Sequence, residues 1–151
     1  MTENVEGTTT RGFELEAAGA ISDRWNVSAG YTFRTSKDKD GHKFAADQPK
    51  HTLKLATDYR LGDRLTLGGA MRWQTGTDSM DFASDVEQPN VHQGSYAVFD
   101  LNASYALSEK ADLTLSVNNI LDRKYYATTG FYDTVVYGED RSLELTLRAR
   151  F

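Results

Sequence analysis

Residues 142–151 read SLELTLRARF and alternate strictly between polar and apolar side chains. A period of two is the signature of a β-strand, in which successive side chains point to opposite faces. The apolar row consists of Leu143, Leu145, Leu147, Ala149 and Phe151. Such a row packs against a second sheet in a soluble sandwich, or faces lipid in a membrane barrel. The rest of the chain has to distinguish these two folds.

Six earlier segments show the same period, and we expect an antiparallel meander of about seven strands without a helix. The expected strands cover residues 11–21, 25–34, 52–59, 65–74, 99–107, 112–118 and 142–151. They are joined alternately by turns of roughly three residues and by loops of roughly fifteen to twenty, as in bacterial outer-membrane barrels with short periplasmic turns and long extracellular loops. The predicted fold is all-β and part of a transmembrane β-barrel.

The polar rows of these strands carry many charges, which a dry core does not accept without partners but a wet lumen does. The charged residues of these rows are Glu14, Glu16, Arg34, Lys54, Asp58, Arg72, Asp100, Glu144, Arg148 and Arg150. Aromatic residues lie near strand ends on the apolar side, as in the girdles of a barrel. They are Trp25, Phe33, Tyr59, Trp73, Phe99, Tyr105 and Phe151. The alternative is a soluble or small membrane β-sheet protein with a binding or structural role and no transport activity.

Composition narrows the possible functions of this 151-residue chain. Its formal net charge of −5 and the lack of a basic patch argue against a nucleic-acid partner. It has no cysteine, which excludes disulfides, thiolate metal sites and cysteine nucleophiles. The first twelve residues, MTENVEGTTTRG, have neither a basic nor an apolar segment of a signal peptide. We therefore expect either a cytoplasmic protein or a mature or excised piece of a longer one.

Four stretches resemble a known family: RGFELEAAGAISDRWNVSAGYTF, PKHTLKLATDYRL, RLTLGGAMRW and, most specifically, LTLSVNNILDRKYY together with the terminal strand. They look like the C-terminal barrel strands of TonB-dependent outer-membrane receptors, in particular the ferric-siderophore group. The resemblance covers nearly the whole chain from Arg11. It implies a receptor and transporter segment in the outer membrane of a Gram-negative bacterium, and not an enzyme.

The resemblance also implies partners and a position in a larger protein. The family has an N-terminal plug domain, a motif that contacts TonB, and a barrel of about 22 strands. Residues 1–151 then form a single C-terminal barrel segment without the plug, not competent for transport alone. Its expected partners are the lipid bilayer, the barrel-assembly machinery through the strand ending at Phe151, and a ferric siderophore in the parent. TonB is reached only through the missing N-terminal part, and no cofactor is expected besides the siderophore as ligand.

An odd strand number makes the first and last strands parallel, so they do not close an antiparallel barrel. Closure across one parallel pair occurs but is unusual, and seven strands leave a narrow interior. We therefore expect an open curved sheet, a small closed barrel with one parallel seam, or a segment that sits within a larger barrel.

The last long loop is rich in aromatic residues, which suit stacking against a bulky iron chelate. The predicted substrate-binding residues are Trp73, Arg123, Tyr125, Tyr126, Phe131, Tyr132 and Tyr137. Lys124 and Arg141 are further cations that suit an anionic chelate. The alternative is that these aromatics belong to the girdle and to loop packing. The predicted membrane-facing residues are Leu143, Leu145, Leu147 and Phe151.

Residues 36–47 partly match a calcium-binding loop, but interspersed lysines and the lack of flanking helices favour a solvated hairpin tip. The acidic loop from Asp78 to Glu87 is likewise expected to be solvated. The three histidines are too scattered for a metal site, so none is predicted. A hydrolase at the barrel rim requires His51 or His92 beside an aspartate, and no motif supports it.

Overall fold

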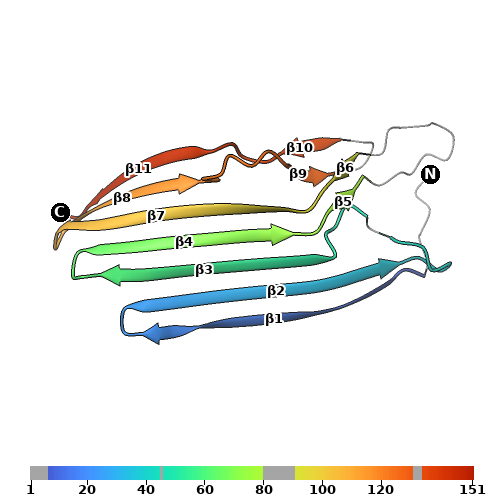
Figure 1. The fold of residues 1–151 in the computed structure, drawn as a ribbon, viewed down its shortest axis with the longest axis horizontal. Helices are drawn as coiled ribbons and strands as arrows, with labels where there is room; N and C mark the ends of the chain where they lie inside the picture. The colour runs from blue at the N-terminus through green and yellow to red at the C-terminus, as the bar shows by residue number, and fades with distance from the viewer. Residues whose placement is uncertain (1–6, 45, 80–90, 131–133) are drawn as a thin grey trace.

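The computed structural model describes residues 7–44, 46–79, 91–130 and 134–151, and these form one large antiparallel sheet and two small ones (Figure 1). The seven strands of the large sheet are β1 (Thr9–Ser22), β2 (Trp25–Lys37), β3 (His51–Leu61), β4 (Leu65–Gln74), β7 (Tyr96–Ser108), β8 (Ala111–Asn118) and β11 (Ser142–Ala149). They pair in that order, and each neighbouring pair is antiparallel. The predicted seven-stranded meander is confirmed.

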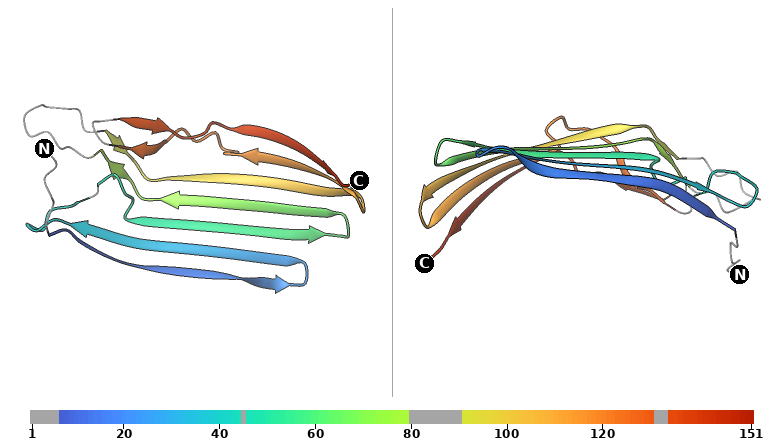
Figure 2. Two further views of the ribbon diagram at one scale, coloured as in Figure 1. Left: turned by 180° about the vertical axis from the view of Figure 1, so that it is seen from behind. Right: turned by 90° about the horizontal axis from the view of Figure 1, so that it is seen from below.

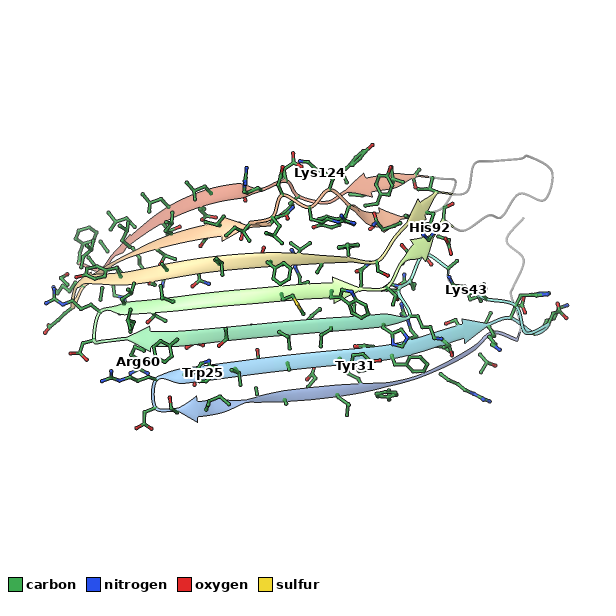
Figure 3. The ribbon with its side chains drawn as sticks, in the orientation of Figure 1. Trp25, Tyr31, Lys43, Arg60, His92 and Lys124 are labelled. Carbon is green, nitrogen blue, oxygen red and sulfur yellow. The ribbon has the colours of Figure 1, made fainter. Side chains whose placement is uncertain are left out.

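The connections lie at two ends of the sheet, named here the turn end and the loop end. Residues 23–24, 62–64 and 109–110 form the short turns, where Gly62 adopts a φ of 74° in the left-handed region that glycine occupies without strain. Residues 38–50, 75–95 and 119–141 form the long connections. Figure 3 shows Trp25 and Arg60 at the turn end, and Lys43 and His92 at the loop end.

The long connections contain short strands that the sequence did not indicate. β5 (Thr77–Asp78) pairs with β6 (His92–Gln93), and β9 (Tyr126–Thr129) pairs with β10 (Val135–Tyr137). These strands have two to four residues, too few to show a period. Strand ends also differ from those predicted: β2 extends to Lys37 because it pairs with Thr9, and the last strand ends at Ala149 rather than Phe151.

The register places every predicted apolar row on one face, named here the apolar face. Tyr31 on β2 pairs with Leu53 on β3, which pairs with Trp73 on β4. At the other edge, Leu115 on β8 pairs with Leu145 on β11. A slip of one residue reverses the faces of a strand, so the match across all seven strands is strong evidence that one environment covers this face.

The opposite face is polar and carries the predicted charges. One cross-strand row runs from Glu16 through Gly30 and Lys54 to Arg72. Arg72 lies 3.8 Å from a carboxylate oxygen of Asp100. Charged side chains at adjacent positions need water or polar partners, which is consistent with a face that lines a wet lumen.

The sheet is open and curved (Figure 2), which is one of the three predicted arrangements. β1 and β11 form its two edges and run in the same direction, as the odd strand count requires. Unpaired strand edges expose backbone donors and acceptors that favour pairing with further strands. The geometry is therefore that of a wall with two sides available for extension.

Little of the described sheet is buried. Leu143, Leu145 and Leu147 are 71%, 65% and 63% exposed, and Phe151 is fully exposed. The buried apolar residues of the described chain are Tyr96 and Val98, which lie near the loop end. The apolar face of the described sheet is therefore largely uncovered by the chain itself. No helix in the described part of the chain has the length and apolar character to span a membrane.

Candidate functional site

The three long connections are joined to one another at the loop end. The base of the last connection is organised by Asn119, which is 2% exposed and has a φ of 48°. Its Nδ2 donates to the carbonyls of Arg123 and Glu139, both at 2.9 Å, and its Oδ1 accepts from the Arg123 backbone at 2.8 Å. Its own backbone N–H donates to Asp100 on β7 at 2.8 Å. One side chain therefore ties both ends of the loop to the sheet.

A charged group closes the same loop on its outer side. The Lys124 ammonium lies 2.6 Å from Asp140 and 3.3 Å from Asp122, and the Arg141 backbone donates to Asp122 at 3.1 Å. The hydrogen bond to Asp140 raises the pKa of Lys124. The hydrogen bond from Arg141, together with the Lys124 ammonium, lowers the pKa of Asp122. Lys124, which the sequence had suggested for an anionic chelate, is thus already paired within the loop.

The last connection folds back over the polar face through stacked aromatic rings. Tyr125 stacks on Tyr96 with ring centroids 4.4 Å apart and 29° between the ring planes. Gly138 lies directly against the Tyr125 ring, which occupies the space that a Cβ on residue 138 would need. Beside this stack is a cavity of about 280 Å³, lined partly by Lys54 and Arg72. Tyr125 is therefore a packing residue whose ring faces are covered by protein.

The last connection is also bonded to the β5–β6 hairpin. The backbone N–H of Tyr126 donates to the side chain of Gln93 at 2.7 Å, and the hydroxyls of Thr129 and Thr77 are 3.2 Å apart. Gln93, Thr129 and Thr77 are all buried, at 7%, 1% and 3% exposure. Buried polar groups are stable only when hydrogen-bonded, so this contact is a specific junction.

A second junction joins the β5–β6 hairpin to residues 38–50. Asp78 on β5 accepts from His92 on β6 at 2.6 Å and from Lys43 at 3.2 Å, and its backbone N–H donates to the Ala46 carbonyl at 3.0 Å. The His92 hydrogen bond and the Lys43 ammonium lower the pKa of Asp78. The described parts of the three long connections are therefore joined by hydrogen bonds into one layer, named here the bonded layer, at the loop end, where Figure 3 shows Lys43 and His92.

The Asp78–His92 pair is the arrangement that the hydrolase alternative required. Its carboxylate also lies 3.2 Å from the Lys43 ammonium, so Asp78 is shared between a histidine and a lysine. His51 instead bonds the Tyr31 hydroxyl at 2.7 Å in the aromatic cluster of the apolar face. The structure therefore places an aspartate beside His92 and a tyrosine hydroxyl beside His51.

The loop with a partial calcium motif forms a turn. One oxygen of Asp38 accepts from the backbones of Asp40 and His42 at 2.9 and 2.8 Å. Possible ligand atoms of Asp38, Asp40 and His42 lie within 4.8 Å of one another, whereas Asp47 is outside this group. The Asp38 carboxylate thus closes the turn through two backbone N–H groups.

The predicted substrate-binding residues have different positions. Trp73 belongs to the apolar row of β4, on the face opposite to Arg72. Arg123 is held through its backbone, and its side chain is exposed. Tyr126 and Tyr137 meet edge to face at 5.3 Å, and Tyr137 is 73% exposed. Phe131 and Tyr132 lie outside the described residues. Of the predicted residues, Arg123 and Tyr137 are exposed, and Tyr126 packs against Tyr137.

Sequence reasoning missed the residues that hold this layer together. Asn119 was within a recognised motif, and asparagine after a strand is among the few residues that accept a positive φ. Tyr96 had a clearer signal, because it is an aromatic in the polar row of its strand. Gln93 and Thr129 had none, since their partners are distant in sequence.

Comparison with known proteins shows which family the chain resembles over most of its length. Residues 1–120 match the family model of the TonB dependent receptor-like β-barrel. The chain is 34% identical over 151 residues to the ferric-pyoverdine BN7/BN8 receptor of Pseudomonas putida, covering 97% of this chain and 17% of that protein. It is 34% identical over 146 residues to the ferripyoverdine receptor of Pseudomonas aeruginosa, covering 94% and 18%.

Solved structures agree with these relatives. The outer-membrane ferripyoverdine receptor of Pseudomonas aeruginosa bound to ferripyoverdine superposes with a TM-score of 0.85 at 33% identity, covering 94% of this chain and 19% of that chain. The open form of the ferric-catecholate import receptor of Escherichia coli K12 has a TM-score of 0.81 at 23% identity, covering 95% and 21%, and supports the fold alone. The chain spans less than a fifth of the length of the two curated relatives named above.

Proposed function

Because the chain belongs to the TonB-dependent receptor β-barrel family, we propose that it forms part of the wall of an outer-membrane receptor that takes up ferric siderophores. The observation that carries the proposal is the match of nearly the whole chain, loops included, to proteins named as ferric-pyoverdine receptors. The open edges of β1 and β11 are consistent with a segment that pairs with further strands on both sides. Transport is then an activity of the parent barrel and not of this chain alone.

The bonded layer at the loop end supports a role in ligand capture. It presents the exposed ring of Tyr137, the edge-packed Tyr126 and the exposed Arg123 on the last connection. Aromatic rings stack on bulky chelates, and a guanidinium pairs with an anionic group. In this proposal these three residues contact the ferric siderophore, while Tyr125 holds them in place.

The remaining partners follow from the same proposal. The chain supplies the C-terminal strands of the parent barrel, and its last strand with Phe151 is the segment that the barrel-assembly machinery engages. TonB acts through another part of the parent. Leu143, Leu145, Leu147 and Phe151 contact lipid, as their exposure and common face support.

Tryptophan fluorescence tests ligand capture directly. The chain in neutral detergent micelles is titrated with ferripyoverdine, and saturable quenching is expected. Tyr137→Ala should weaken binding by roughly 2- to 10-fold, the range of one aromatic contact. Tyr59→Ala, which removes a tyrosine that pairs with Trp25 at the turn end, is the matched control and should leave the affinity unchanged. Lack of saturable quenching by ferripyoverdine, ferrioxamine and a ferric catecholate would contradict the proposal for this chain.

A further inference from the structure

A basic pocket lies at the loop end of β2, away from the aromatic group on the last connection. It has a volume of about 350 Å³ between the strand end and residues 41–50. Four of its lining side chains are cationic, namely Arg34, Lys37, Lys43 and Lys50, and none is acidic. The whole chain has a net charge of −5, so a group of four cations without an acid in the lining is not a reflection of composition.

Two of these cations have no acidic partner. Lys43 is paired with Asp78 at 3.2 Å, and Arg34 donates to the Gln48 side chain at 2.7 Å. Lys37 and Lys50 are exposed, and no carboxylate in the described part of the chain lies within ion-pair distance of either. Within the described residues, Lys37 and Lys50 thus have ammonium groups without a carboxylate partner, whereas Arg34 belongs to the charged row of the polar face and is bonded to Gln48.

The pocket adjoins the edge of the apolar face. The Lys50 ammonium lies 5.5 Å from the centre of the Phe33 ring. Phe33 belongs to an aromatic cluster of that face, with Phe13 and His51 at centroid distances of 5.6 and 5.1 Å. Aromatic rings and lysines that lie where apolar surface ends are typical of the level of lipid headgroups in a membrane.

We propose that this pocket binds the phosphate of a lipid headgroup in the membrane leaflet at the loop end. Lysine is a common phosphate ligand, and basic pockets at the headgroup level bind anionic lipids. The acyl chains of that lipid then lie along the apolar face beside Phe33, which a free anion in solution has no reason to contact. This role is separate from siderophore capture, because the pocket shares no residue with Arg123, Tyr126 and Tyr137.

The test compares micelles that differ only in the lipid headgroup. The chain in neutral detergent micelles is titrated by calorimetry with micelles containing dioleoyl phosphatidic acid or dioleoyl phosphatidylcholine. Preferential binding of phosphatidic acid is expected, weakening as salt is raised from about 20 to about 300 mM because exposed charges are screened. Equal binding of both lipids, or binding that salt does not alter, would overturn the proposal.

Charge-matched variants locate the site. Lys37→Gln with Lys50→Gln should weaken binding of phosphatidic acid on the order of 30-fold, from the usual contribution of two lysines near an anionic surface. Lys39→Gln with Lys110→Gln removes the same charge outside the pocket and should change the affinity less than about 2-fold. Equal losses in the two variants would show general attraction instead of a site. Circular dichroism checks that each variant keeps its strands, and Lys37→Arg with Lys50→Arg should retain binding.

Two further measurements separate the alternatives. Inorganic phosphate that competes as strongly as the lipid would identify a free-anion site and refute the lipid assignment. Quenching by ferripyoverdine should remain unchanged in Lys37→Gln with Lys50→Gln. Failure of the lipid proposal and failure of the siderophore proposal are thus distinguished by different ligands and different variants.

Discussion

Replacing Asn119 with alanine is expected to release the connection over residues 119–141 while the seven-stranded sheet stays folded. The substitution removes three hydrogen bonds of the side chain, two to carbonyls and one from a backbone N–H. It leaves the backbone hydrogen bonds of the β8–β11 ladder in place. The effect should therefore be local opening and not global unfolding.

The size of the effect follows from burial. Each hydrogen bond contributes about 1 kcal/mol net, so three contribute about 3 kcal/mol, and alanine at a positive φ adds a cost of about 1 kcal/mol. Asn119 is 2% exposed, so its former partners have little access to water when the loop is closed. The total loss of about 4 kcal/mol corresponds to an increase on the order of 1000-fold in the population of the open loop.

Amide hydrogen exchange measures this population. The reporters are the N–H groups of Gly138 and Gly130, which bond the carbonyls of Tyr125 and Thr134 and do not touch Asn119. Both should exchange on the order of 1000-fold faster in Asn119→Ala, with β8 and β11 unchanged.

Neighbouring and isosteric variants sharpen the test. Asn118→Ala removes one hydrogen bond of 3.2 Å to Ser142 at the surface and should have little effect on the reporters. Asn119→Asp keeps the acceptor for Arg123 but turns an oxygen toward the Arg123 and Glu139 carbonyls, so it should be at least as harmful as alanine. If the Gly138 and Gly130 amides of Asn119→Ala exchange within about 3-fold of their rates in the unsubstituted chain, the reasoning is refuted. The hydrogen bonds of Asn119 would then contribute none of their usual net free energy.

Three further outcomes are expected. The pKa of Asp78 lies below its ordinary value of 3.8, so its bonds to His92 and Lys43 stabilise the bonded layer above pH 3.8 and are lost as the pH falls through the lowered pKa. Amide exchange in the long connections should therefore rise in acid, and Asp78→Asn should remove this pH dependence. Leu145→Lys should impair insertion into lipid vesicles by about 2–4 kcal/mol if that position is near the bilayer midplane. Thr146→Lys, on the polar face, should be tolerated, and equal insertion of the two variants would contradict the assignment of the apolar face to lipid. Gly138→Ala places a Cβ against the stacked tyrosine ring and should cost about 1–3 kcal/mol of loop stability by hydrogen exchange, compared with Gly94→Ala, where nothing lies within 4 Å.

The strands and their faces were predictable because both depend on local geometry. A period of two in side-chain direction follows from the extended backbone, so the terminal strand and the six before it were visible without a structure. Short turns then bring consecutive strands together in an antiparallel register, and the apolar rows align. Family resemblance rested on the same residues, and the comparisons confirmed it.

The site was only partly predictable, because its bonds join residues far apart in the chain. Tyr125 and Tyr137 have the same residue type in one loop, yet the first is stacked against Tyr96 and the second is 73% exposed. Loop composition does not distinguish these cases, since the difference depends on what the fold places beside each ring.

The sequence by itself thus determined that the chain is an antiparallel sheet with one apolar and one charged face. The tertiary structure decided that the sheet stays open and that Gln93, Thr129 and Asp78 join the three long connections. It also decided that Arg34, Lys37, Lys43 and Lys50 line one pocket. The physical reason is the range of the interactions. Alternation is set residue by residue along the backbone, whereas buried hydrogen bonds and charge clusters depend on contacts between residues that only the folded chain brings together.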